Sequence, residues 1–246
     1  TRILGLKAHL GLNKKAKEAL VPAPEVLAGA LGKEEYKEMH KAISRDCITL
    51  VKYKDRDVLP ITPERYKRIM IVHVKGAESG MGMLMKAMGM GGGKNPAEML
   101  KERLCEKGFD AFIYESPLDA MKKQIAAGEK PNINLYFAGK NAIDDFVSGM
   151  DLVITLCDVS SGRPSFGLSK GGGEIPWYVF ELPVVVIGCG QPTMLADVPQ
   201  ARTYINTYDA KPATFDALVD DLMAGPDAFK GRDPIDSFCG LFDARL

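Results

Sequence analysis

The sequence predicts an α/β fold, a three-layer sandwich with a mainly parallel sheet of about six strands and helices on both faces. Apolar, β-branched runs alternate along the chain with helical patterns of 10–15 residues, as in parallel sheets. The runs at 68–74 and 182–190 show little polar alternation, which is typical of strands covered on both faces. Hydrophobic residues make up 46% of the 246 residues, enough for a sizeable core.

The first 45 residues predict helices and a connector rather than sheet. Residues 2–10 have a helical apolar pattern with no N-cap before it, so we expect the end of a helix that continues something upstream. Residues 11–32 are rich in prolines and small residues, which indicates a connector with a short helix. Residues 33–47 predict an amphipathic helix, because Tyr36, Met39 and Ile43 fall on one face.

The β–α alternation occupies the rest of the chain. Apolar runs predict strands, in order, at 47–52, 68–74, 110–115, 132–139, 151–158, 182–190 and 200–208. Helical patterns fall at 95–107, 116–129, 141–149, 175–181 and 212–225. The helix at 95–107 has Asn95 as its N-cap, Pro96 at its first position and Gly108 at its end. Ligands of such sheets bind beyond the carboxyl ends of the strands, so we expect the functional edge there.

Charge and cysteine usage exclude several classes. Thirty-two basic residues balance thirty-two acidic ones, which argues against a general nucleic-acid binder. No apolar run reaches about 18 residues, so no membrane span is predicted. The five cysteines contain no CxxC pair and the three histidines are scattered, so we expect free thiols in a reducing compartment and no metal site.

The glycine-rich segment 75–94 follows a strong strand and ends in Gly-Lys, as a phosphate-binding loop does. The P-loop pattern GxxxxGK[ST] needs glycine at 88 and Ser or Thr at 95, where the sequence has Met88 and Asn95. The dinucleotide pattern GxGxxG fails too, at Met85 when it starts from Gly80. Five methionines indicate instead a flexible loop that contacts another domain. No cofactor is predicted.

A second glycine-rich loop, 158–174, follows the strand at 151–158. It carries polar side chains of the kind that hold a sugar or supply a carboxylic acid, namely Asp158, Ser160, Arg163 and Glu174. The residues alone fit two interpretations equally, a sugar-binding loop and a mobile surface loop.

Ordered blocks of the chain resemble the C-terminal domain of glycoside hydrolase family 3. In that family a buried strand leads into G-x-P-x-x-L, and a later helix is followed by F-x-G-x-x-P. The matching residues here are Gly190, Pro192 and Leu195, then Phe229, Gly231 and Pro234. The stretch 43–74 resembles the entry into that domain, and residues 1–12 resemble the last helix of the preceding barrel.

The resemblance implies two regions: 1–45 as the end of a barrel domain with connector helices, and 46–246 as the α/β sandwich domain. It also implies a (β/α)8 barrel partner in the same parent chain, a carbohydrate substrate at the interface, and cleavage of β-glycosides with retention. Retention needs a carboxylate nucleophile and an acid/base about 5–5.5 Å apart. The family's nucleophile is a barrel aspartate, so we expect this chain alone to be inactive.

The resemblance also bears on individual residues. In the glucosidase branch a glutamate of this domain is the acid/base, and Glu174 is the only glutamate in the corresponding loop. No glutamate lies near Asp158, which favours the β-N-acetylhexosaminidase branch, where a barrel histidine takes that role. Asp158, Ser160 and Arg163 are the candidate substrate contacts.

Two other functions stay open from the sequence. One is a stand-alone, flavodoxin-like ligand-binding module, and the other is a purely structural interdomain module. The absence of a signal peptide at Thr1 favours the cytoplasm. The mid-helix opening also predicts that the chain is a segment of a longer protein.

Overall fold

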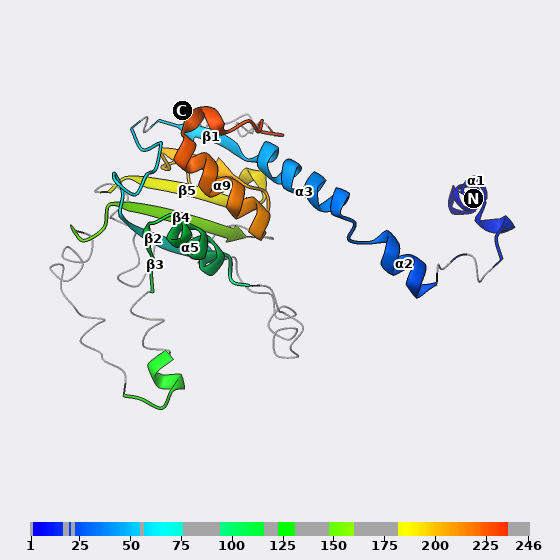
Figure 1. The fold of residues 1–246 in the computed structure, drawn as a ribbon, viewed down its shortest axis with the longest axis horizontal. Helices are drawn as coiled ribbons and strands as arrows, with labels where there is room; N and C mark the ends of the chain where they lie inside the picture. The colour runs from blue at the N-terminus through cyan, green and yellow to red at the C-terminus, as the bar shows by residue number, and fades with distance from the viewer. Residues whose placement is uncertain are drawn as a thin grey trace. The chain divides into compact units, whose positions relative to one another are not determined.

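A computed structural model describes residues 2–16, 20, 23–54, 57–75, 94–115, 123–130, 148–159 and 182–235. The chain divides into two compact units, Thr1–Ile43 and Ser44–Leu246. The division falls inside a helix, α3 (Glu34–Cys47). Figure 1 shows the helices and strands of both units.

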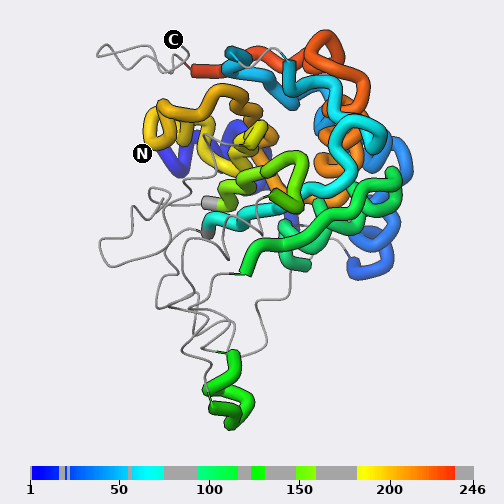
Figure 2. The backbone as a smooth tube through the Cα atoms, turned by 90° about the vertical axis from the view of Figure 1, so that its left-hand side faces the viewer, coloured from blue at the N-terminus to red at the C-terminus, as the bar shows by residue number. Residues whose placement is uncertain are grey.

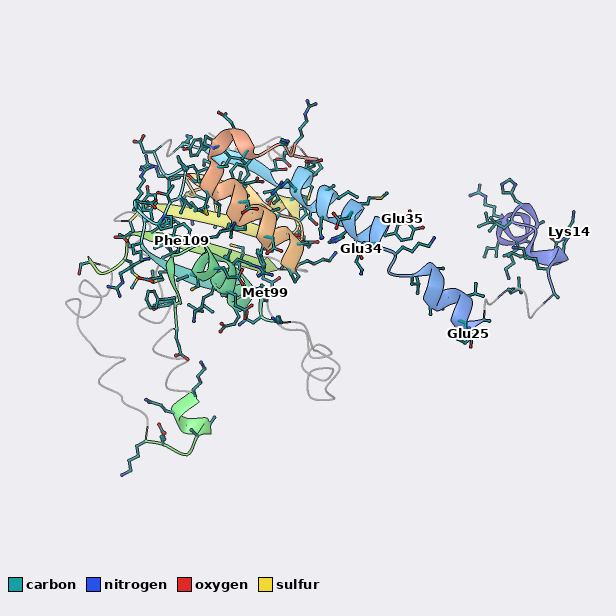
Figure 3. All side chains as sticks on the ribbon, viewed as in Figure 1. Lys14, Glu25, Glu34, Glu35, Met99 and Phe109 are labelled. Carbon is teal, nitrogen blue, oxygen red and sulfur yellow. The ribbon has the colours of Figure 1, made fainter. Side chains whose placement is uncertain are left out.

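The first unit is helical. It contains α1 (Arg2–His9), the 3₁₀ turn η1 (Leu12–Lys14), α2 (Pro24–Ala30) and most of α3. Glu34 and Glu35 in the first turn of α3 (Figure 3) oppose the positive end of the helix dipole and favour a helix start there. Neither α1 nor α2 has a buried residue.

The amphipathic pattern of α3 is present, but its apolar face is exposed. Tyr36, Met39 and Ile43 each keep half or more of their surface accessible. Only Ser44, at the start of the second unit, is buried in this helix. The described part of the first unit exposes apolar side chains on α1, α2 and α3, and those of α1 and α2 include Ile3, Leu4, Leu6, Val26 and Leu27.

The described residues of the second unit form a six-stranded sheet. Its strands are β1 (Thr49–Tyr53), β2 (Arg68–Lys75), β3 (Asp110–Ile113), β4 (Leu152–Val159), β5 (Val184–Gly190) and β6 (Thr203–Asn206). Their order is β1-β6-β5-β4-β2-β3. Only β1 is antiparallel to its neighbour, and the other four pairings are parallel. The predicted α/β class with a mainly parallel sheet is confirmed.

The five parallel strands have the order of a flavodoxin-like, doubly wound sheet. The chain leaves β2 towards β3 on one side, and β4 then lies against the other side of β2. The gap between the carboxyl ends of β2 and β4 is therefore the switch point, where such sheets bind their ligands.

Two layers cover the sheet. The helices α5 (Pro96–Glu106) and α9 (Pro212–Ala224) lie over one face (Figure 1), where Leu100 and Phe215 pack among the buried strand residues. Met99 and Phe109 (Figure 3) belong to the same core. The other face packs against η4 (Pro192–Asp197) through Met194 and Leu195, and Figure 2 shows this gold segment on the side opposite α9.

The local sequence explains how β5 ends and η4 begins. Gly190 has a φ of 138°, which side-chain-bearing residues rarely adopt. Pro192 then occupies the first turn of η4, where its missing N–H costs nothing. Leu195 is fully buried. In the G-x-P-x-x-L block, the glycine therefore ends the strand, the proline begins the 3₁₀ helix, and the leucine packs in the core.

Several predicted elements lie outside the described residues. They are the strand at 132–139, the helix at 175–181, the first half of the helix at 116–129 and most of the helix at 141–149. The last short helix in the described part is η5 (Pro226–Ala228). Among the described helices, none combines the length and the apolar character that a membrane span would need.

Candidate functional site

His73 and Asp158 meet at the switch point of the sheet. Strands β2 and β4 are parallel neighbours, and Lys75 is in register with Asp158. Side chains alternate along a strand, so His73 shares the face of Ile69 and Ile71, which α5 and α9 cover. The Nε2 atom of His73 lies 3.8 Å from a carboxylate oxygen of Asp158.

The His73 side chain is largely buried, yet its Nε2 atom lacks a hydrogen bond to Asp158. The His73 side chain is 7% exposed and that of Asp158 is 33% exposed. A separation of 3.8 Å is too long for a hydrogen bond. Within the described part of the chain, Nε2 of His73 is buried and has no hydrogen-bond partner. Buried polar atoms are normally bonded, so an unbonded one at a switch point indicates a place for a ligand or water.

A row of polar side chains runs from Asp158 to Cys189 near the end of β5 and Thr207 directly after β6. Cys189 is in register with Asp158, and the Thr207 hydroxyl lies 3.3 Å from its Sγ atom. Burial raises the pKa of the Cys189 thiol to about 12, with the nearby Asp158 contributing. Burial also raises the pKa of Cys157, which packs on the opposite face. Neither thiol is ionised near neutral pH, so neither is a nucleophile there.

Asp209 completes the row, but its carboxylate is already engaged. It accepts hydrogen bonds from the backbone N–H of Lys211, at 3.3 Å, and from the Thr214 hydroxyl. It also pairs with the Lys211 ammonium at 3.2 Å. Asp209 therefore fixes the entry into α9. Of the two carboxylates in the row, Asp158 is the one that faces an unsatisfied group.

The structure places one of the four predicted site residues. Asp158 lies on the predicted functional edge, whereas Ser160, Arg163 and Glu174 lie outside the described residues. Segment 76–93 of the first glycine-rich loop does so too, and the predicted roles of both loops stay predictions. The ranges that the structure describes contain no group of three or more metal-ligating side chains.

Sequence reasoning missed His73. It treated the three histidines as scattered, because none has a partner at close spacing in the sequence. The available signal was a single ring in the last third of an apolar strand, at the edge where ligands bind. Its pairing with Asp158 depends on β2 and β4 being neighbours, which the sequence does not state.

No family model matches the chain. A β-N-acetylglucosaminidase/β-glucosidase of Cellulomonas fimi is 30% identical over 250 residues, which cover all of this chain and 39% of that protein. The solved structure of the β-glucoside phosphorylase BglX is 29% identical, with a TM-score of 0.69 over 99% of this chain and 39% of its own. These neighbours are glycoside hydrolase family 3 enzymes, and over its full length the chain is similar to part of them.

More distant structures share the fold of this chain. A family 3 β-N-acetylglucosaminidase of Paenibacillus matches with a TM-score of 0.53 at 15% identity, which supports the fold alone. The resemblance to the family's C-terminal α/β sandwich domain is therefore confirmed. The chain spans about two fifths of the length of the relatives that it matches, so these enzymes contain at least one further domain.

Proposed function

We propose that this chain is the C-terminal domain of a retaining β-glycosidase of the β-N-acetylhexosaminidase or β-glucosidase type. The full-length match to part of the Cellulomonas fimi enzyme carries the proposal. In it, residues 1–45 connect to a (β/α)8 barrel, and residues 46–246 form the sandwich domain. The barrel supplies the nucleophile, and the carboxyl edge of the sheet walls the sugar site.

The exposed side chains of the helical unit support a partner domain. Leu4 and Ile3 of α1 and Leu31 after α2 keep more than 60% of their surface exposed. The face of α3 that carries Met39 and Ile43 is similarly open. Apolar surface on this scale usually marks an interaction site. A barrel of the same parent chain would cover it.

Two groups of residues would act at the sugar. Asp158, Ser160 and Arg163 are proposed substrate contacts, and of these Asp158 stands at the switch point. Glu174 is the acid/base candidate of the glucosidase alternative. In the N-acetylhexosaminidase alternative, the acid/base comes from the barrel, and this domain only shapes the site.

Transfer of the glycosyl group to phosphate instead of water is a second candidate. The observation that favours it is the name of the BglX relative, a β-glucoside phosphorylase at 29% identity. Both reactions would use the same barrel nucleophile, and in both the carboxyl edge of this sheet would line the sugar site. They differ in the acceptor that attacks the glycosyl intermediate.

A chimera tests the proposal. This chain replaces the matched 39% of the Cellulomonas fimi enzyme, and the product is assayed on aryl β-glucosides and aryl β-N-acetylglucosaminides, with and without phosphate. We expect activity from the chimera and none from this chain alone. A sugar 1-phosphate formed only with phosphate would favour the phosphorylase.

Three controls accompany the chimera. The parent Cellulomonas fimi enzyme fixes the reference rate, and its remaining domain without this chain fixes the background. A Glu174→Gln chimera separates the two branches, because it loses activity only if Glu174 is the acid/base. A folded chimera with background activity on every substrate would count against the proposed function.

A further inference from the structure

The polar atoms of His73 and Asp158 face each other without a direct hydrogen bond. Nε2 and the carboxylate oxygen are 3.8 Å apart, too far to bond each other. Hydrogen bonds to oxygen span about 2.7–3.0 Å, so a single oxygen atom placed beside the pair can reach both. The His73 side chain is only 7% exposed, whereas the Asp158 side chain is 33% exposed and can be reached from solvent.

We propose that His73 and Asp158 together hold one hydroxyl group of a neutral sugar. A hydroxyl both accepts and donates, so it can accept from Nε2–H and donate to the carboxylate in the same pose. The negative carboxylate favours the tautomer that carries its proton on the facing nitrogen. His73 is thus a binding residue of the sugar site, next to the predicted contact Asp158.

The charges around the pair select against other ligands. Asp158 repels an anion, and Asp209 adds negative charge to the same end of the sheet, as its effect on Cys189 indicates. A phosphate group therefore finds no net attraction at this point. A metal ion would need three or more ligands, and the described side chains do not gather so many. A neutral group that donates and accepts is the remaining fit.

The choice of a sugar as the carrier of that hydroxyl rests on the proposed function. The geometry alone fits any neutral group that both donates and accepts, such as water or a hydroxyl. Family 3 relatives named for β-glucosides and N-acetylglucosamine supply the class, because both sugars present several ring hydroxyls. Loss of a buried hydrogen-bond partner is costly, so the pair also favours sugars over deoxy analogues at that position.

Nitrogen NMR of the intact chain tests the inference directly. The ¹⁵N signals of the imidazoles are followed during titration with glucose, N-acetylglucosamine and inorganic phosphate. We expect a saturable shift of His73 Nε2 with at least one sugar and no shift with phosphate. His9 and His40, which belong to the helical unit, are internal controls whose signals stay in place.

Variants at the partially exposed aspartate keep the test independent of folding. Asp158→Ala removes the acceptor, and we expect the sugar affinity to fall roughly tenfold or more. Asp158→Asn keeps an acceptor without the charge, and we expect its sugar affinity to lie between those of the parent chain and Asp158→Ala. The exposed Asp227→Asn is the matched control and leaves the affinity unchanged. Thermal melting verifies that each variant is folded.

The outcomes separate this inference from the proposed function. An unmoved Nε2 signal at saturating sugar, a phosphate-driven shift, or equal sugar affinity in Asp158→Ala would overturn it. An active chimera combined with any of these results leaves the function standing and removes the His73 role. Sugar binding through His73 combined with an inactive chimera supports the site and rejects the enzyme proposal.

Discussion

The backbone N–H of Gly231 donates to the carbonyl oxygen of Ile48 at 3.0 Å, joining the end of the fold to the start of β1. The approach is so close that a Cβ atom on Gly231 would lie 2.4 Å from the Cys47 carbonyl oxygen and 2.5 Å from that of Ile48. The glycine of the F-x-G-x-x-P block is therefore required by contact with backbone atoms, which cannot move aside as a flexible side chain would.

Gly231→Ala is expected to destabilise the sheet unit by about 1–3 kcal/mol, the usual cost of overpacking. Urea unfolding followed by circular dichroism measures the loss. Gly29→Ala is the matched control, because nothing lies within 4 Å of a Cβ at that position. Equal stabilities of Gly231→Ala and the parent chain would show that the contact relaxes freely.

Gly188→Ala is expected to clash with a side chain rather than with backbone. Its Cβ would lie 2.3 Å from the Tyr204 hydroxyl, which donates to the Asn206 side-chain oxygen at 3.0 Å. Tyr204→Phe alone should cost about 1–2 kcal/mol, because the Asn206 side-chain oxygen loses this donor. Because Phe removes the clashing oxygen, the double variant should be more stable than the sum of the single changes predicts, by about 1 kcal/mol. Strict additivity in a double-mutant cycle would contradict this coupling.

Asp221 of α9 gives the fold a pH dependence in the acidic range. Its pKa is raised to about 6, chiefly by burial and also by Asp220 and Asp46, while Arg45 and Lys230 oppose the shift. One of its carboxylate oxygens is buried and unbonded within the described structure. The folded pKa exceeds the unfolded value of about 4, so the folded state binds the proton more tightly. Asp221 therefore favours folding below pH 4, and this contribution is lost as the pH rises to 6.

Asp221→Asn should remove this dependence and stabilise the chain by roughly 1–3 kcal/mol at pH 7.5. The free energy of unfolding is measured in urea at intervals from pH 4 to pH 8. Asp227→Asn, an exposed change in η5, should leave the profile of the parent chain intact. A parent profile without any decline between pH 4 and pH 6 attributable to Asp221 would argue against the raised pKa.

Asn95 caps the helix that begins beside the functional edge. Its side-chain oxygen accepts from the Ala97 N–H at 3.1 Å. Asn95→Ala should cost about 1 kcal/mol, whereas Asn95→Ser should keep most of the stability. Amide hydrogen exchange in the first turn of α5 is the local measurement. Unchanged exchange of the Ala97 amide in Asn95→Ala would mean that the cap contributes nothing.

The strands in the described ranges were predictable because their patterns are local. The apolar runs at 68–74 and 182–190 became β2 and β5 within two residues at each end. The reversed direction of β1 was not predictable, because it depends on the pairing of Leu50 with Ile205, far away in the sequence. The contact between His73 and Asp158 was not predictable for the same reason, because it depends on the pairing of β2 with β4. The spacing of the apolar residues in α3 predicted its apolar face, but it did not predict that this face is exposed.

The buried thiols of Cys157 and Cys189 can report how often the central strands open. Cys157 and Cys189 are at most 2% exposed on neighbouring strands, on opposite faces, while Cys105 of α5 is exposed. Among the described thiols, a reagent should therefore modify the exposed Cys105 at once and the partly buried Cys47 more slowly, and it should reach Cys157 and Cys189 only when β4 and β5 separate. Their slow alkylation would time the opening of the central strands, in cell extract as well as in buffer, without any introduced label.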